Sequence, residues 1–220
     1  MIIAPVPQLR TPRIWGTLSA SGGVGATTLT FHLARVAARA GVRVLLIETD
    51  IRAPLREILA AQPPFWEEYR NRTSFPAEAL PRPCQAGFAF LTRRSVEPIA
   101  DEVFIDVIQT VREYFDLILI DQPITKILES DLLLVAENTL PSLIGLNVFR
   151  EIYKPKIVLV NKFTPRVKKR AAIEGFILDE KVFRIATAAD LHLTMGFGIA
   201  RKSSKRNERV FEEILSELLR

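Results

Sequence analysis

The sequence predicts an α/β fold in which one mainly parallel sheet carries helices on both faces. Short, almost continuously apolar runs of strand length alternate with segments whose apolar residues recur at helical spacing. Strands that are buried on both faces have this apolar character, because helices cover a parallel sheet on each side. No change of composition and no flexible linker divides the 220 residues. We therefore expect one domain over residues 1–220, with residues 1–12 as a flexible N-terminal arm.

The first part of the chain begins the alternation of strands and helices. Residues 14–20 form a strand-like apolar run that ends in glycines, and apolar spacing up to Gly41 predicts a helix over residues 27–41. A β-branched run predicts a buried strand over residues 42–50. The stretch over residues 54–83 is rich in proline and aromatic residues, and we expect helical fragments and loops there.

The rest of the chain continues the same pattern. The remaining expected elements are strands at 87–93, 115–121, 131–138, 156–163 and 181–187, and helices at 98–114, 142–153 and 209–220. The closing helix has apolar residues on one face and glutamates on the other. Because a helix lying on a membrane carries Lys and Arg on its polar face, we expect this helix to pack on the sheet instead.

Composition excludes several classes of protein. Cys84 is the one cysteine, so an intrachain disulfide framework and a multi-cysteine metal or iron–sulfur site are both excluded within one chain. No apolar run approaches the roughly 18 residues that cross a bilayer. The first residues lack the charged-then-apolar order of a signal peptide. We therefore expect a cytoplasmic protein with no membrane partner.

Positive charge gathers late in the sequence. The formal net charge is +5, yet the segment from Lys162 to Arg209 holds twelve basic and five acidic residues. The candidate basic patch consists of Arg166, Lys168, Lys169, Arg170, Arg201, Lys202, Lys205 and Arg206. Such runs bind nucleic-acid phosphates or anionic lipid in some proteins and form a solvated basic face in others.

The segment from Ser19 to Thr28, SASGGVGATT, has the composition of a phosphate-binding loop between a strand and a helix. Glycines let successive backbone N–H groups face one anion, and the following helix adds the positive end of its dipole. The expected nucleotide-binding residues are Ser21, Gly22, Gly23, Val24, Gly25, Ala26, Thr27 and Thr28. The Thr27 hydroxyl is placed to bind Mg²⁺. The alternative is a tight glycine-rich turn without a ligand.

Acidic residues follow two of the expected strands. Glu48 and Asp50 flank Thr49 at the end of a strand, so their side chains point to the same side. Asp121 follows four apolar residues and lies beside the glycine loop in a parallel sheet of this order, where it could hold a metal-bound water. The alternatives are solvated acids at residues 48 and 50 and a buried capping acid at residue 121.

The motif SGGVGATT at residues 21–28 resembles the deviant Walker A loop of the ParA/MinD superfamily, usually written KGGVGKTT. The chain is most similar to the CpaE/TadZ-like branch, found with pilus assembly and secretion machines. VRVLLIETD, FDLILIDQP and IVLVNKF resemble, in order, the family's switch I strand, its Walker B-like segment and the strand whose asparagine contacts adenine. The resemblance implies a P-loop NTPase-like sheet.

The same resemblance implies a set of ligands and roles. The cofactors would be ATP or ADP with Mg²⁺, and Asn161 would contact the base. Thr27 would bind the metal directly and Asp121 through a water, while Asp50 and Asp121 would serve catalysis if the protein hydrolyses ATP. A homodimer and a protein partner in a pilus, secretion or partition system would also be expected.

The departures from the family pattern concern hydrolysis. Ser21 stands where the family's signature lysine would cross a dimer interface, and Ala26 stands where the phosphate-loop lysine would be. Asp131 follows Asp121 by only ten positions, so the switch II region is short. We therefore expect ATP binding with weak or absent hydrolysis, unless another cation replaces the lysines. The candidates by position are Arg52, Arg56 and Lys126.

The function that the resemblance implies is an ATP-binding switch that positions or regulates a cellular assembly such as a pilus or secretion machine. The alternative is a DNA-partition or nucleoid-binding relative that uses the basic residues near the C-terminus. A metabolic enzyme on the same fold is a third reading, which the single cysteine and the missing lysine oppose.

Overall fold

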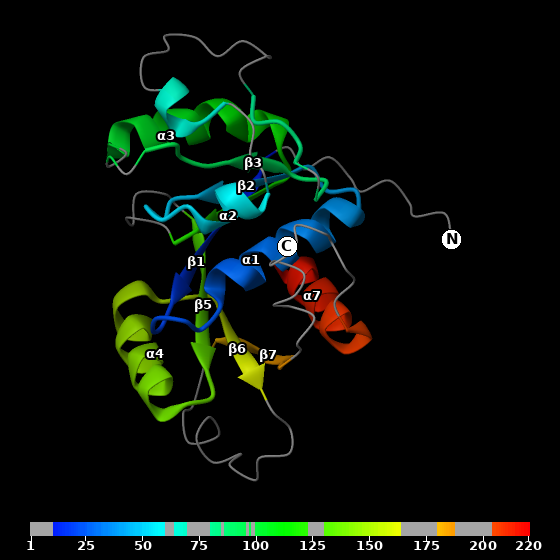
Figure 1. Cartoon of the computed structure of the whole chain (residues 1–220). Coiled ribbons are helices and arrows are strands. Elements are labelled where there is room, and N and C mark those ends of the chain that lie inside the picture. Colours follow the sequence, from blue (N-terminus) through cyan, green and yellow to red (C-terminus); the bar gives the residue numbers. More distant parts are fainter. Residues whose placement is uncertain are drawn as a thin grey trace.

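The computed structural model describes residues 11–59, 64–69, 80–84, 86–95, 97, 100–122, 130–163, 180–187 and 204–220. Its strands form one seven-stranded sheet in the order β3-β2-β4-β1-β5-β6-β7. Each neighbouring pair in this sheet is parallel. The predicted parallel α/β fold is therefore confirmed (Figure 1).

The sheet and its helices have clear bounds along the chain. The strands are β1 Arg13–Ser19, β2 Val44–Glu48, β3 Ala89–Leu91, β4 Leu117–Asp121, β5 Asp131–Glu137, β6 Ile157–Phe163 and β7 Lys181–Ala186. The α-helices are α1 Ala26–Arg39, α2 Pro54–Ile58, α3 Asp101–Val111, α4 Leu140–Tyr153 and α7 Lys205–Leu218. Short 3-10 turns at Trp66–Glu68 and Arg112–Tyr114 complete the described elements.

Alternation of side chains along strand β4 divides the core into two layers. Leu117 and Leu119 of β4 belong to the cluster with the buried faces of α1 and α7. Ile118 and Ile120 point to the opposite face, into the cluster with α3. Because neighbouring side chains of a strand point to opposite faces, a strand covered on both sides has to be apolar at every position. The helices thus cover both faces of the sheet, as expected.

Helix α4 covers the same face of the sheet as α3, but over β5 and β6. Leu134 of β5 and Val158 of β6 lie in one cluster with Leu143 and Leu146 of α4. On the opposite face, the ring of Phe211 in α7 stacks on His32 of α1 with centroids 5.6 Å apart. The closing helix therefore packs against α1 and the sheet, as its amphipathic pattern predicts.

Helix and strand boundaries differ from expectation by up to four residues. Helix α7 begins at Lys205, four residues before the expected start, because the Ser204 side chain accepts a hydrogen bond from the Asn207 amide and caps the helix. Helix α1 begins at Ala26. The expected N-terminal arm falls largely on residues 1–10, which lie outside the described residues. In the described part of the chain, the helices are too short or too polar to cross a membrane.

Candidate functional site

The glycine loop connects β1, the middle strand of the sheet, to α1 at the carboxyl edge of the sheet. Gly23 and Gly25 have φ angles of 76° and 88°, in the left-handed region that L-residues rarely adopt. Gly25 is the N-cap of α1 and has no side chain to cap it. The first N–H groups of α1 have no partners within the helix, so this end of the helix favours an anion.

Strand β6 holds the loop from one side. The Asn161 side-chain Nδ2 donates to the Val24 carbonyl oxygen at 2.7 Å. A Cβ on Gly25 would come within 2.6 Å of the same nitrogen. Asn161, expected to contact a base, therefore binds the glycine loop directly. A larger residue at position 25 would have to displace the Asn161 amide and would be strained at a φ of 88°.

Lys162 is a second contact from β6 that sequence reasoning missed. Its Nζ donates to the Gly23 carbonyl oxygen at 2.8 Å and forms an ion pair with Glu137. Its φ angle of 53° is unusual for lysine and coincides with a register irregularity between β6 and β7. The dipeptide Asn-Lys at a strand end was visible in the sequence, but its contact with the loop depends on the strand order.

The strand ends bring the predicted acids together. In the sheet register, Asp121 of β4 pairs with Glu48 on one side and with Thr17 of β1 on the other. The Thr49 hydroxyl donates to the Asp121 carbonyl oxygen at 2.8 Å and joins β2 to β4. Gln122 Nε2 donates to Ser19 Oγ at 2.7 Å and joins β4 to β1. The acids and the glycine loop therefore belong to one site.

Asp121 is completely buried, and neither of its carboxylate oxygens has a hydrogen-bond partner among the described residues. Burial, together with the nearby carboxylates of Glu48 and Asp50, raises the pKa of Asp121 to about 7. The Thr27 hydroxyl opposes this rise in pKa, although it makes no regular hydrogen bond with the carboxylate. A buried carboxylate without a partner is costly unless a cation or a water completes the site.

Unlike Asp121, Glu48 has a hydrogen-bond donor for each of its carboxylate oxygens. Its Oε1 accepts from the Leu55 amide at 2.6 Å, and its Oε2 accepts from Thr92 Oγ1 at 2.7 Å. Burial raises the pKa of Glu48, while these hydrogen bonds lower it. Both oxygens are occupied, so Glu48 ties β2 to α2 and to the residue after β3.

The carboxylate of Asp50 forms a hydrogen-bonded ion pair with Arg52. Arg52 Nη2 lies 2.6 Å from Asp50 Oδ2, and Arg52 Nε lies 3.1 Å from each carboxylate oxygen. The Arg52 amide also donates to Oδ1 at 2.9 Å. The hydrogen bonds from Arg52 hold the pKa of Asp50 below its ordinary value. In this state Asp50 is ionised and paired with Arg52.

The donor set fits a magnesium–nucleotide complex at the glycine loop. Asp121 offers an unpartnered carboxylate and Thr27 a hydroxyl at the start of α1, which are the hard oxygen donors that Mg²⁺ prefers. Within the described residues there is no cluster of three or more His, Cys, Asp or Glu side chains suited to a metal. A Mg²⁺ ion bound with a nucleotide keeps several waters and phosphate oxygens, so it takes one or two protein ligands.

Helix α4 touches the start of the glycine loop, which sequence reasoning also missed. A Cβ on Gly145 would lie 2.2 Å from the Ala20 carbonyl oxygen. The backbone of α4 therefore packs directly on the residue that follows β1. A lone glycine within an apolar helical pattern was the available signal, because such a glycine usually marks a close approach of two backbones.

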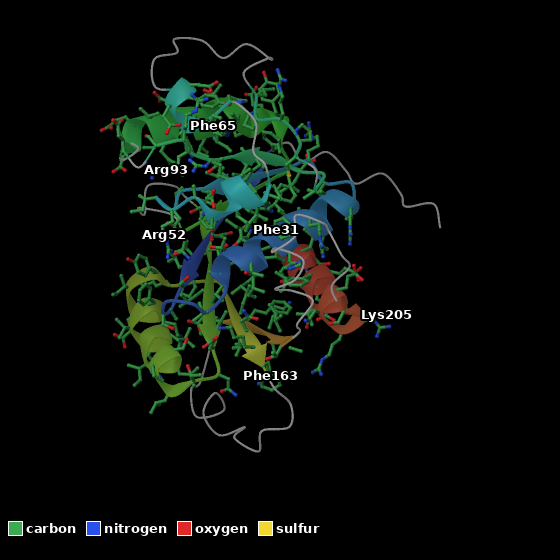
Figure 2. The ribbon with its side chains drawn as sticks, viewed as in Figure 1. Phe31, Arg52, Phe65, Arg93, Phe163 and Lys205 are labelled. Atoms are coloured by element: carbon green, nitrogen blue, oxygen red, sulfur yellow. The ribbon has the colours of Figure 1, made fainter. Side chains whose placement is uncertain are left out.

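The candidate basic patch is separate from this site where it can be placed. Lys205 and Arg206 are exposed at the start of α7. Figure 2 shows Lys205 on the opposite side of the molecule from Arg52, which lies near the acids. The other six patch residues, at 166, 168–170, 201 and 202, and the candidate cation Lys126 lie outside the described residues.

Comparison with protein families gives one match. Residues 16–186 match the model of the CobQ/CobB/MinD/ParA nucleotide binding domain. This range begins in β1 and ends with β7, so it contains the glycine loop, the strand-end acids and Asn161. No curated protein sequence matches the chain.

Solved structures share the fold. The MinC:MinD cell division complex of Aquifex aeolicus has a TM-score of 0.75 at 21% identity, covering 94% of this chain and 96% of that chain. MinD complexed with Mg-ADP from Pyrococcus horikoshii has a TM-score of 0.75 at 19% identity, with the same coverage. An AMPPNP-bound putative plasmid partition protein of Borrelia burgdorferi has a TM-score of 0.70 at 17% identity, covering 94% of this chain and 98% of that chain.

Proposed function

The chain belongs to the CobQ/CobB/MinD/ParA nucleotide-binding domain family, and we propose that it is an ATP-binding switch with weak or absent hydrolysis. One observation carries the proposal: the buried, unpartnered carboxylate of Asp121 lies at the end of the strand beside the glycine loop. The switch would be a single unit over residues 1–220.

Each part of the site has a role in holding the nucleotide. The backbone amides of residues 21–26 and the start of α1 would bind the phosphates, with Thr27 and Thr28 at the first turn of the helix. Asp121 and Thr27 would hold the magnesium ion, which neutralises phosphate charge. Asn161 and Lys162 support the loop from β6 and would lie on the base side.

Weak hydrolysis follows from the cations that the loop lacks. Ala26 is buried in the core with no charged group, and Ser21 is neutral. Removing one preorganised donor to a transition-state oxygen typically costs about 10²–10³ in rate. Asp50, the candidate acid for holding the attacking water, is paired with Arg52. Both features support binding without efficient turnover.

Calorimetric titration of the purified chain with ADP and with ATP, each with Mg²⁺, tests this proposal. We expect both nucleotides to bind and phosphate release to be barely detectable. Ala26→Lys should tighten binding first, because the new ammonium would add a charge-assisted contact, and should raise turnover only if Asp50 already holds the water. An absence of nucleotide binding, or robust turnover that Asp50→Ala abolishes, would contradict the proposal.

We assign the expected homodimer to an apolar stripe on α4. Its four residues are spaced by four and are 50–65% exposed: Leu140, Ile144, Val148 and Ile152. This spacing suits the commonest ridge-into-groove packing of two helices. Thr139 does not cap α4 through its side chain, and the first turn has no acidic residue. Antiparallel packing of two copies would bring the exposed Glu151 of each near the positive end of the other helix.

Sedimentation velocity tests this assignment with two variants. Ile144→Glu places a charge in the middle of the stripe and should shift the chain from dimer to monomer. Tyr114→Glu alters another exposed apolar residue, outside α4, and should leave the dimer unchanged. A wild-type chain that stays monomeric with Mg²⁺ and ATP, or an Ile144→Glu variant that still dimerises, would show that α4 is not the interface.

The proposal also covers the cellular assembly on which the switch acts. A role in positioning or regulating a pilus or secretion machine, as in the CpaE/TadZ-like branch, rests on the resemblance of the loop. A DNA-partition role is the alternative, supported by exposed Lys205 and Arg206 and by the similarity to a putative plasmid partition protein. Binding of duplex DNA that weakens steeply with salt would favour the alternative.

A further inference from the structure

Negative charge dominates the carboxyl ends of β2 and β4. Glu48, Asp50 and Asp121 lie close enough that each of the first two raises the pKa of the third. The loop itself offers no lysine, since residues 21 and 26 are Ser and Ala. A nucleotide triphosphate at this site would therefore need a cation from outside the glycine loop.

Most arginines near the acids are already committed. Arg93 is buried, and its Nε and Nη1 donate to the carbonyl oxygens of Ser95 and Thr49 at 2.8 and 3.3 Å. Arg56 Nη1 donates to the carbonyl oxygens of residues 93 and 94 at 3.1 and 2.9 Å. These guanidinium groups stabilise the backbone around β3, and moving them would break those contacts.

Arg52 differs from both. Its side chain is 82% exposed, and it lies in the turn after β2, paired with Asp50. Figure 2 shows Arg52 just below Arg93, on the same side of the molecule. Its charge also acts on Asp121, whose pKa it lowers. The guanidinium thus acts on the carboxylate proposed to hold the metal. If it turned away, the Arg52 amide, 2.9 Å from Asp50 Oδ1, would still donate to that carboxylate.

The Asp50–Arg52 pair is open to solvent on the arginine side. The Asp50 side chain is only 10% exposed, whereas that of Arg52 is 82% exposed, so water reaches the guanidinium and reduces the net stability that the pair contributes. A terminal phosphate carries more negative charge than a carboxylate and matches the planar fork of a guanidinium equally well. Arg52 would therefore bind a terminal phosphate in preference to the Asp50 carboxylate.

We propose that Arg52 leaves Asp50 to bind the terminal phosphate of a nucleoside triphosphate, so that the exchange distinguishes triphosphate from diphosphate. The inference rests on the proposed function and adds a residue to it. Asp50 is released by the same movement, so its carboxylate is free only in the triphosphate state. The pair thereby replaces, in part, the lysines that the loop lacks.

Calorimetry with two nucleotides tests the role of Arg52. Wild-type chain, Arg52→Ala and Arg52→Lys are titrated with Mg-ADP and with Mg-AMPPNP, an analogue that is not hydrolysed. Arg52→Ala removes a hydrogen-bonded charge pair with the terminal phosphate, so it should weaken AMPPNP binding about 10- to 100-fold. ADP binding should change less than about twofold, since a diphosphate lacks the terminal group. Arg52→Lys should recover part of the lost affinity.

A second set of variants separates direct contact from the general effect of charge. Arg39→Ala removes a cation that pairs with Glu208 at the other end of α1 and should leave both affinities unchanged. Asp50→Asn should tighten AMPPNP binding in the wild-type background by freeing Arg52. The same change should have a clearly smaller effect in the Arg52→Ala background.

The outcomes of these titrations distinguish a failure of the Arg52 role from a failure of the proposed nucleotide-binding function. Equal losses of ADP and AMPPNP affinity in Arg52→Ala, or no loss of either, would overturn the role of Arg52 alone. An Asp50→Asn effect that is the same with and without Arg52 would also overturn it. A wild-type chain that binds neither nucleotide would overturn the proposed function, and this inference with it.

Discussion

Replacing Asp121 by asparagine is expected to make the nucleotide-free chain more stable at pH 8, although it removes the central acid of the site. The pKa of Asp121 rises from an ordinary 3.8 to about 7 in the folded chain. At about 1.4 kcal/mol for each pH unit, ionised Asp121 destabilises the fold by about 4 kcal/mol. A buried amide without partners costs about 1–3 kcal/mol. The expected net gain is therefore about 2 kcal/mol.

The sign of the pH dependence follows from proton binding. Between about pH 4 and pH 7 the folded chain holds the Asp121 proton more tightly than the unfolded chain does, so the free energy of unfolding falls as the pH rises. Glu48, whose pKa is also raised, adds a slope of the same sign. Asp121→Asn should flatten the fall without removing it entirely.

Urea denaturation at pH 5 and pH 8 measures this effect. Asp101→Asn removes one exposed carboxylate at the start of α3 and should preserve the wild-type slope. The functional cost appears when Mg²⁺ and ADP are added, because they should protect the wild-type chain and leave Asp121→Asn unprotected. An Asp121→Asn chain that is less stable than wild type at pH 8 would show that a partner stabilises the ionised carboxylate of Asp121.

Replacing Gly145 by alanine is expected to destabilise the chain, against the usual effect of this substitution. In a helix interior, alanine is ordinarily more stable than glycine by roughly 0.5–1 kcal/mol. At residue 145, however, the new Cβ would lie 2.2 Å from the Ala20 carbonyl oxygen and 3.2 Å from its carbon. Both contacts are with backbone, so either α4 or the start of the glycine loop must move. Such overpacking typically costs about 1–3 kcal/mol.

Two measurements separate the possible responses to this clash. Urea denaturation of Gly145→Ala reports the loss of stability, and calorimetry with Mg-ADP reports whether residue 20 has moved the loop. Asn147→Ala, an exposed position on the same helix, should be neutral or slightly stabilising because alanine is the better helix former. A Gly145→Ala chain with wild-type stability and affinity would show that α4 can shift away without disturbing the loop.

The fold could be predicted because its signals are local. Nearly continuous apolar runs such as residues 117–120 describe strands buried on both faces, and α1 repeats its apolar residues at helical spacing. The glycines between β1 and α1 identify the loop, since Gly23 and Gly25 need φ angles that other residues avoid. Asp121 could be placed beside this loop because parallel strands end at one edge of the sheet.

Roles within the site could not be predicted in the same way. Asp50 was the candidate acid and Glu48 its support, but their partners could not be predicted: Glu48 accepts hydrogen bonds from Leu55 and Thr92, while Asp50 pairs with Arg52. The Thr92 contact spans 44 positions. A carboxylate takes whichever donors the surrounding elements bring to it, and those donors are not neighbours in the sequence.

The sequence by itself determined the parallel sheet, the glycine loop, the missing lysines and the acids at the strand ends, because apolar periodicity, backbone freedom and residue type are properties of short segments. Only the tertiary structure decided that Lys162 binds the Gly23 carbonyl, across 139 positions, and that Gly145 meets Ala20. Both contacts require strand order β4-β1-β5-β6 and the packing of α4 on that sheet. The contacting segments are far apart in the sequence, and neither carries a local signal that identifies the other. Only the close packing of the whole chain brings them together.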